Sequence, residues 1–330
     1  MVTSALEVLA AGPLTTVQDL GRPGWAHLGV SVSGAADTAS LTLANRLVGN
    51  PDNAAGLEIT FGGLQARMRC RRPNGSPTIR YLALTGAPCP ATVNGRPVAL
   101  NTPIPVQDGD VLAVGLPACG LRTYLAVRGG LTPPAALGSR STDLLSGIGP
   151  PPLKPCDTLP VGEPAGPMPG VDLAPRNAPP ATFTLRVLPG PRDDWFEQAS
   201  LSELFTARWE ATSDSNRIGI RLAGPPLRRS RTDELPTEGT VHGALQVPPN
   251  GQPVLFLTDH PVTGGYPVIG VVHQADLPLA GQIPPGAPIR FRTALRPSRR
   301  PDTPSPPPTC CARRTGTWCW GAGSTRRRPR

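Results

Sequence analysis

The sequence predicts a mainly β protein with a few helices, of the antiparallel barrel or sandwich type. Between residues 81 and 127, short β-prone runs recur about every ten residues, with turn signals between them. Asn94-Gly95 is a strong signal for a two-residue hairpin, and Asp108-Gly109 marks another turn. The 45 prolines and 37 glycines are spread between apolar runs, as in a turn-rich globular protein.

The chain of 330 residues is long enough for two domains. Residues 149–180 contain eleven prolines, a composition typical of a semi-rigid linker. Its first part, residues 153–161, also fits an edge strand of the first domain. We therefore expect a β-barrel domain over 1–162, a Pro-rich linker over 163–180, a second β-barrel domain over 181–296 and an atypical tail over 297–330.

Two strands and a helix open the predicted first domain. Residues 4–9 and 14–19 are β-prone and are separated by a Gly-Pro turn. Residues 35–48 carry apolar side chains at a spacing of three to four, which predicts a helix. Ser33 or Asp37 can cap this helix, and a Gly-Asn-Pro run ends it.

The next predicted strand, residues 57–61, contains a carboxylate in an otherwise apolar run. If Glu58 points inward, it needs a cationic partner such as Arg22 or Arg46. If it points outward, it has no such need. Arg46 also falls in the last turns of the predicted helix, where a cation interacts favourably with the helix dipole.

The predicted second domain begins with β-structure at residues 183–190. Residues 193–205 predict either a pair of helices or one helix interrupted at its serines, and we expect Trp195 to belong to the core. Residues 268–273 and 288–293 are the last predicted strands.

The tail, residues 297–330, has no hydrophobic periodicity. Its eight arginines and one acidic residue, Asp302, contribute +7 of the net charge of +9, so the rest of the chain carries only +2. A nucleic-acid partner is therefore not favoured by the charge of the body. We interpret the tail as disordered, and as the product of a frameshifted or mispredicted gene end; a genuine basic interaction tail is the alternative.

Several functional classes lack their sequence signatures. There is no GxxxxGK[ST] loop, no GxSxG motif and no HExxH motif. The four histidines form no spaced metal pair and the four cysteines before the tail show no CxxC spacing, so no metal site is expected. No signal peptide and no apolar run of about 18 residues is visible. These features favour a cytoplasmic protein without a membrane partner; an exported disulfide-bonded protein is the alternative.

The stretch from residue 242 to residue 270 is the leading candidate for function. Two turn clusters, at 248–253 and 263–267, flank the apolar run 254–257. A rigid strand with polar groups at both ends is typical of a binding site, and a hairpin with solvated turns is the alternative. The polar groups at these ends are Gln246, Asn250, Gln252, Asp259, His260 and Tyr266.

These residue types predict how such a site would bind a ligand. Backbone N–H groups freed by Gly264 and Gly265 can bind an oxyanion or a carboxylate. The side-chain amides of Asn250 and Gln246 can hydrogen-bond an amide group on both of its edges. Arg217 or Arg128 can bind a carboxylate through two parallel hydrogen bonds. The combination suits a small planar substrate with an amide and an acid group, although surface loops have a similar composition.

Motifs spread over residues 5–293 resemble, in order, those of one family. They are Thr15-Thr16-Val17-Gln18-Asp19, Gly21-Arg22, Gly34-Ala35, Asp37, Ala44-Asn45, Leu47-Val48-Gly49-Asn50, Leu57-Glu58-Ile59-Thr60, Leu84-Thr85-Gly86-Ala87, Arg122-Thr123-Tyr124-Leu125-Ala126-Val127, Gly129-Gly130, Gly138-Ser139, Ser141-Thr142-Asp143, Ser215-Asn216-Arg217, Gly219, Arg221-Leu222, Gln246-Val247-Pro248, Asn250-Gly251-Gln252-Pro253 and Thr263-Gly264-Gly265-Tyr266-Pro267. This series resembles the allophanate hydrolase subunit 2 family, also called the biotin-dependent carboxyltransferase family.

The resemblance implies a cyclophilin-like β-barrel fold and three possible functions. The first is one subunit of a bacterial ATP-dependent 5-oxoprolinase, which opens the lactam of 5-oxo-L-proline to L-glutamate. The second is the carboxyltransferase subunit of a biotin-dependent urea carboxylase-like enzyme. The third is a non-enzymatic regulator that binds a kinase inhibitor. Residues after the last strand depart from the family pattern.

The resemblance also implies partners. The chain has no biotin-carrier Met-Lys-Met motif and no segment of the size of an ATP-grasp domain. We therefore expect ATP to be bound together with partner proteins that resemble the A and B subunits of 5-oxoprolinase, and the chain to be inactive alone. Biotin is implied only if the carboxyltransferase function holds.

The resemblance finally suggests roles for particular residues. Asp19, Asp37 and Asp259 are the candidate catalytic groups. Arg22 or Arg217 is expected to bind the substrate carboxylate. The groups expected to orient the substrate amide are Gln246, Asn250, Asp259, Gly264, Gly265 and Tyr266.

Overall fold

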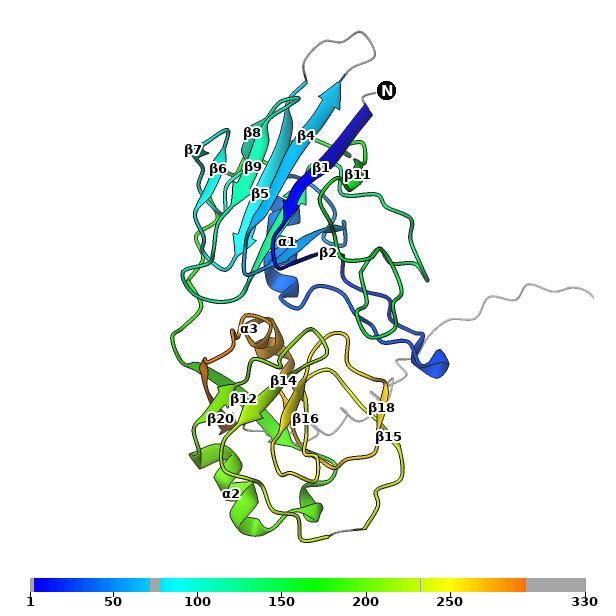
Figure 1. The fold of residues 1–330 in the computed structure, drawn as a ribbon, viewed down its shortest axis with the longest axis vertical. Helices are drawn as coiled ribbons and strands as arrows, with labels where there is room; N and C mark the ends of the chain where they lie inside the picture. The colour runs from blue at the N-terminus through cyan, green and yellow to red at the C-terminus, as the bar shows by residue number, and fades with distance from the viewer. Residues whose placement is uncertain (1–2, 72–77, 232, 295–330) are drawn as a thin grey trace, which may run out of the picture. The chain divides into compact units, whose positions relative to one another are not determined.

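Strands dominate because short β-prone runs are interrupted throughout by glycine and proline turns. The computed structural model of the chain describes residues 3–71, 78–231 and 233–294, shown in Figure 1. The described part is mostly β with three short α-helices, which confirms the predicted fold class. The predicted tail over 297–330 lies outside the described residues.

Two sheets make up the N-terminal half, by which we mean the described residues up to Val161. Their strand orders are β11-β1-β4-β9-β6-β7 and β2-β3-β10-β5-β8. Apolar side chains from both sheets, including Leu6 and Leu57, pack into one core. The strands are β1 (Thr3–Ala11), β2 (Leu14–Gln18), β3 (Gly56–Thr60), β4 (Leu64–Arg71), β5 (Arg80–Gly86), β6 (Ala91–Val93), β7 (Arg96–Pro97), β8 (Ile104–Val106), β9 (Val111–Val114), β10 (Arg122–Val127) and β11 (Thr158–Val161).

The N-terminal half differs from the closed barrel predicted over 1–162. Among the described strands, hydrogen bonds close no ring there, and the two sheets instead share a core. Sequence spacing predicts strands and turns equally well for a sandwich and a barrel, because the two differ only in how the edge strands pair.

The C-terminal half, residues 183–294, contains the predicted closed barrel, with strand order β12-β19-β16-β17-β14-β13-β20. Its strand pairs are antiparallel except β12 with β20, which run parallel and lie side by side in Figure 1. Closure leaves these strands no free edge. The barrel strands are β12 (Phe183–Pro189), β13 (Trp209–Ala211), β14 (Gly219–Ala223), β16 (Ala244–Gln246), β17 (Val254–Phe256), β19 (Val268–Val272) and β20 (Pro288–Thr293), and a separate pair is formed by β15 (Glu238–Gly239) and β18 (Thr263–Gly264).

The helices are short and begin where the sequence supplies a cap. α1 (Thr38–Leu47) begins three residues later than predicted, because Asp37 is its N-cap and accepts a hydrogen bond from the Ser40 amide at 2.9 Å. α1 packs through Ala44 and Leu47 against β5 and β10, which explains why every residue of β10 is buried.

The predicted helical region over 193–205 is a pair of elements, which are separated by extended backbone at Phe196. The remaining helical elements are η1 (Ala26–Leu28), η2 (Asp193–Trp195), α2 (Gln198–Thr206), η3 (Gln274–Asp276) and α3 (Leu277–Ala280). Within the described residues, no helix is long and apolar enough to cross a membrane. The described residues form one compact unit ending at Ala294, and the division into two domains at 163–180 stays a prediction.

Candidate functional site

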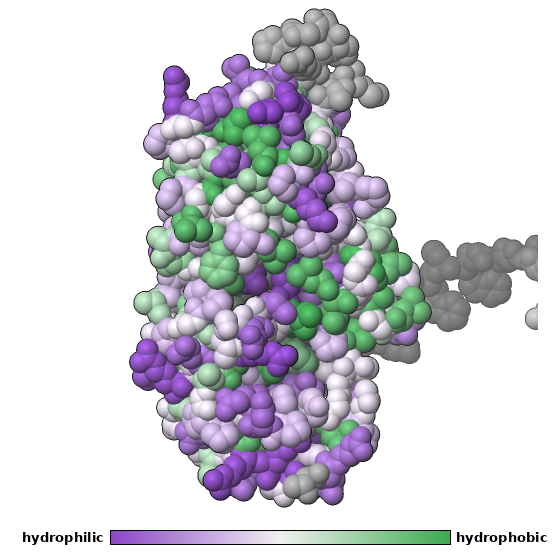
Figure 2. Space-filling model, in the orientation of Figure 1, coloured by the Kyte–Doolittle hydropathy of each residue, from purple (hydrophilic) through white to green (hydrophobic). Residues whose placement is uncertain are grey.

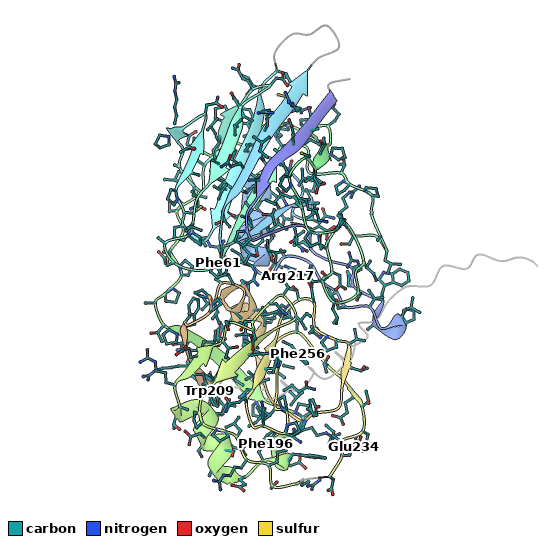
Figure 3. All side chains as sticks on the ribbon, in the orientation of Figure 1. Phe61, Phe196, Trp209, Arg217, Glu234 and Phe256 are labelled. Atoms are coloured by element: carbon teal, nitrogen blue, oxygen red, sulfur yellow. The ribbon has the colours of Figure 1, made fainter. Side chains whose placement is uncertain are left out.

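Arg217 lies at the centre of a buried ion network that joins the two halves. The side chain of Asn216 accepts a hydrogen bond from the Ile218 amide at 2.8 Å, and this local turn places Arg217 just before β14. The Arg217 side chain, labelled in Figure 3, is completely buried. It donates to the Glu58 carboxylate of β3, and through Nε and Nη2 to Asp259 at 2.9 and 3.0 Å.

Glu58 is the carboxylate whose need for a cation was predicted. It is 1% exposed, and Arg122 Nε donates to it at 3.2 Å in addition to Arg217. Burial raises the pKa of Glu58, but the two guanidinium groups outweigh burial, and the pKa lies below its ordinary value. The partners predicted for Glu58, Arg22 and Arg46, are incorrect. Sequence distance hides the true partners, since Arg217 is 159 positions away.

Tyr124 extends this network to α1. Its hydroxyl donates to Glu58 Oε2 at 2.8 Å and accepts from the Asp37 amide at 2.7 Å. Burial, followed by the charges of Glu58 and Asp37, raises the pKa of Tyr124 well above its ordinary value, so the phenol stays protonated and continues to donate. We call Glu58, Arg122, Tyr124, Arg217 and Asp259 the junction network.

The two halves also touch through their backbones beside this network. A Cβ atom on Gly281 would lie 2.4 Å from the carbonyl oxygen of Ala36. The Gly281 carbonyl accepts a hydrogen bond from Arg122. Only glycine permits this approach between the C-terminal end of α3 and the chain before α1.

The side chains of Asp19 and Arg22 are buried and hydrogen-bond to the loop at residues 139–143. The Asp19 carboxylate accepts hydrogen bonds from the Ser139 hydroxyl at 2.6 Å and the Arg140 amide at 2.7 Å. Arg22 is 1% exposed, donates to the Ser141 carbonyl and lies 3.9 Å from Asp143. Burial lowers the pKa of Arg22, although the nearby carboxylates oppose that effect. Both residues contact the segment 139–143, and Nε and Nη1 of Arg22 have no hydrogen-bond partner in the described structure. The predicted contact of either residue with substrate stays a prediction.

Asp37 has a structural task and also borders a cavity. Besides capping α1, its carboxylate accepts from Gln282 Nε2 at 2.9 Å and lies 3.5 Å from Arg176 Nη2. These residues and Ser40 line a cavity of about 350 Å³, with Pro179 on another side. Asp37 therefore lines this cavity with carboxylate oxygens that already accept hydrogen bonds from protein groups.

The residues predicted from the stretch 242–270 fall into separate places. Gln246 Nε2 donates to the Tyr266 carbonyl at 3.2 Å and lies against Gly264, whose added Cβ would be 2.5 Å from it. Tyr266 is 45% exposed, and the guanidinium of Arg229 stands 5.8 Å from its ring centre. A Cβ atom on Gly265 would lie 3.7 Å from the Leu235 carbonyl oxygen, an ordinary van der Waals contact.

Asn250 belongs to another place. It lies in an exposed turn, where its side chain accepts from the Gln252 amide at 3.1 Å. It lines a cavity of about 360 Å³ together with Asp214 and Arg221. The structure therefore does not bring Asn250 together with Gln246.

A third cavity, which we call the histidine pocket, adjoins the junction network. It has a volume of about 310 Å³ and shares Ser33 and Thr258 with the surroundings of Asp259. The space-filling view in Figure 2 shows hydrophobic surface around the η1 region, where Leu28 is 61% exposed. The lining residues are Gly24, Ala26, Val30, Ser31, Val32, Ser33, Thr240, Val241, His242, Thr258, His260 and Val262.

Burial holds both histidines of this pocket in their neutral form. Burial is the main cause that lowers the pKa of His242 to about 4, and the charges of His260 and Arg217 lower it further. Burial also lowers the pKa of His260, against a hydrogen bond to Pro261 and the charge of Asp259. The sequence pointed to His260 as a polar group, but no spacing signal singled out His242.

The fold is thus a pair of β units joined by buried charges, and similarity to known proteins identifies its class. Residues 28–293 match the family model for the carboxyltransferase domain, subdomain A and B. The chain is 39% identical over 297 residues to the C subunit of 5-oxoprolinase from Escherichia coli (strain K12), covering 87% of this chain and 90% of that protein. The chain therefore belongs to the carboxyltransferase domain family.

Two further relatives are longer proteins. Urea amidolyase of Lachancea kluyveri is 36% identical over 317 residues, which cover 87% of this chain but 17% of that protein. The crystal structure of the K. lactis urea amidolyase is similar with a TM-score of 0.79 and 33% identity, covering 88% of this chain and 19% of that chain. The resemblance inferred from the sequence motifs is confirmed.

Proposed function

We propose that this chain is one subunit of an ATP-dependent 5-oxoprolinase-type complex that opens the lactam of 5-oxo-L-proline to L-glutamate. The observation that carries this proposal is the extent of the match. The chain aligns with 90% of the C subunit of E. coli 5-oxoprolinase, but with 17% of the urea amidolyase of L. kluyveri. The match with the C subunit has the higher identity of the two, 39% against 36%, and extends over nearly the whole of that protein.

The reaction requires a site for a small cyclic amide. Water adds its oxygen to the lactam carbonyl carbon, the carbon–nitrogen bond breaks, and the nitrogen takes a proton to become the amine of glutamate. In this chain, the histidine pocket has the size and neutrality that suit such an amide. Gln246 and Tyr266, which the sequence singled out, remain candidates for a second contact.

Two predicted substrate contacts need revision in this proposal. All three nitrogens of the Arg217 guanidinium donate to protein groups, so none is left for a substrate carboxylate. Arg22 is fully enclosed beside Ser141 and Asp143. We therefore assign Arg217 to holding the fold. Arg22 is too deeply buried to meet a substrate carboxylate in this arrangement, although its Nε and Nη1 have no hydrogen-bond partner among the described residues.

At the start of α1, the amides of Ala36 and Ser40 are not free donors for a phosphate of ATP. Phosphate is usually bound by free backbone N–H groups at a helix N-terminus. At the start of α1, carboxylates already occupy these donors: Glu58 accepts from the Ala36 amide at 2.9 Å and Asp37 from the Ser40 amide at 2.9 Å. We therefore propose that partner proteins of the A and B types supply the nucleotide site, and that this chain is inactive alone.

Reconstitution tests the proposal. The chain is co-expressed with candidate partners of the A and B types, and glutamate release from 5-oxoproline is measured with and without ATP. We expect release only when all three proteins and ATP are present. Absence of release from a folded, purified complex of all three proteins contradicts the proposal.

The second candidate is a carboxyltransferase function, favoured by the similarity to the K. lactis urea amidolyase structure. In that function, biotin would be carried by a separate protein. Mixing the chain with a biotin carboxylase and carrier, ATP, labelled bicarbonate and either urea or 5-oxoproline distinguishes the two. Label transfer to urea favours the carboxyltransferase function.

A further inference from the structure

The histidine pocket is built from two segments that are far apart in the sequence. One is the loop from Gly24 to Ser33, which includes η1, and the other is the segment from Thr240 to Val262. The wall is largely apolar, with a few polar groups set into it. Small-molecule sites commonly combine such an apolar wall with a few oriented polar groups.

The hydroxyl groups of the pocket have already committed their protons to protein acceptors. Ser31 donates to Asp143 at 2.9 Å, and Ser33 donates to Asp259 at 2.7 Å. Thr240 donates to the Pro261 carbonyl. A hydroxyl whose proton is committed offers only oxygen lone pairs. These three side chains therefore present acceptors, rather than donors, to anything that enters the pocket.

His260 adds a further acceptor with a defined direction. Its Nδ1 lies 2.8 Å from the Pro261 carbonyl oxygen, which can only accept, so Nδ1 carries the proton of the neutral ring. The lone pair is then on Nε2, which has no hydrogen-bond partner among the described residues. The ring is held by Phe256, whose centre lies 5.7 Å away at an interplanar angle of 11°.

His242 provides the second unused nitrogen. Its ring lies 6.4 Å from that of His260, and its Nε2 is buried without a hydrogen-bond partner in the described structure. A buried polar atom without a partner costs free energy, so a ligand that supplies one gains affinity. The charged groups that act on the two rings are Asp143, Asp259 and Arg217, and all three are engaged with protein groups.

We propose that the histidine pocket binds the N–H edge of a small neutral amide, with His260 Nε2 accepting a hydrogen bond from the ligand N–H. None of the described residues that line the pocket is Arg or Lys, so a free carboxylate is not recognised there. Naming the natural ligand as the lactam of 5-oxoproline rests on the proposed function. The carboxylate of that ligand then lies outside the pocket.

Histidine NMR on the purified full chain tests the inference without any activity assay. The ring nitrogens of the four histidines are followed during titration with 2-pyrrolidinone, a lactam without a carboxylate. N-Methyl-2-pyrrolidinone, which lacks the N–H, is the matched ligand. We expect a saturable shift at His260 Nε2 with the first and binding at least about ten-fold weaker with the second. His27 and His273 lie outside the pocket and serve as internal controls.

Two variants distinguish the role of His260 Nε2 as a hydrogen-bond acceptor from the packing of the His260 ring against Phe256. H260N keeps a side-chain N–H for the Pro261 carbonyl but lacks Nε2, and H260F keeps the ring beside Phe256. We expect both to weaken pyrrolidinone binding at least about ten-fold while the thermal unfolding temperature of one or both stays near that of the wild type. H273N is the control outside the pocket and should bind as the wild type does.

The outcomes distinguish this inference from the proposed function. Equal binding of the two lactams, or no response at His260, overturns the inference even if the reconstituted complex releases glutamate. A response that requires the N–H supports the inference even if the complex is inactive on 5-oxoproline. In that case the proposed function fails, and the pocket serves another amide.

Discussion

The junction network and the histidine pocket lie side by side but differ in how their polar atoms are used. In the network, every nitrogen of Arg217 donates to a protein acceptor. In the pocket, one nitrogen of His242 and one of His260 have no partner among the described residues. Buried charges with complete partners stabilise one arrangement, whereas unused polar groups beside a cavity await a ligand. The difference assigns the network to the fold and the pocket to binding.

The largest expected effect comes from breaking the network with Arg217→Ala. The substitution removes the Arg217 cation from buried Asp259 and leaves Glu58 with Arg122 as its remaining cation. We expect the free energy of unfolding to fall by about 3–5 kcal/mol. Urea denaturation followed by circular dichroism measures it. Arg46→Ala removes an exposed pair with Asp52 and should change the free energy of unfolding very little. An Arg217→Ala loss as small as that of the control contradicts the assignment.

Acid should lower the free energy of unfolding through His242, a residue of the histidine pocket. Its folded pKa of about 4 lies below the ordinary value of 6.5, so the unfolded chain binds the proton first as pH falls. Stability from this group is complete above pH 6.5 and declines toward pH 4, by about 3 kcal/mol at most. Because other groups titrate too, the test is the difference between wild type and His242→Phe. We expect the variant to lose less stability between these pH values, and parallel curves would refute this.

A smaller loss of stability is expected at the close approach of the Gly281 backbone to the Ala36 carbonyl. In Gly281→Ala the new Cβ would overlap the Ala36 carbonyl, which lies in backbone and cannot rotate away. We expect a loss of about 1–3 kcal/mol in unfolding free energy. Gly286→Ala is a poor control because of its positive φ, so Gly239→Ala, where a Cβ meets no atom within 4 Å, serves instead. Equal stability of both variants would show that the contact can relax.

The smallest effect is expected for Asn250→Ala. The change removes one exposed hydrogen bond to the Gln252 amide, worth about 0.5–1.5 kcal/mol, and touches neither the network nor the pocket. Pyrrolidinone binding should equal that of the wild type in the same NMR titration. A clear loss of binding would contradict this expectation and support the sequence-based prediction that Asn250 contacts the ligand.

Local features of this fold could be predicted from sequence, and pairings across the chain could not. Asp37 caps α1 as predicted, because a cap depends on residues within one helical turn. The need of Glu58 for a cation was also predictable, but its partner Arg217 is set by how two distant segments pack. Asn250 was grouped with Gln246 because they are close in sequence, yet their side chains have different neighbours.

The junction network also affects the order of folding during synthesis, because its members are far apart in the sequence. Glu58 leaves the ribosome 159 residues before Arg217, which at usual rates of synthesis is on the order of ten seconds or more. During that interval the strands around Glu58 can form, but the carboxylate lacks one of its two cations. Folding of the N-terminal half is therefore completed only when the C-terminal half arrives. Until then, the incompletely folded N-terminal half is exposed to aggregation and to binding by chaperones.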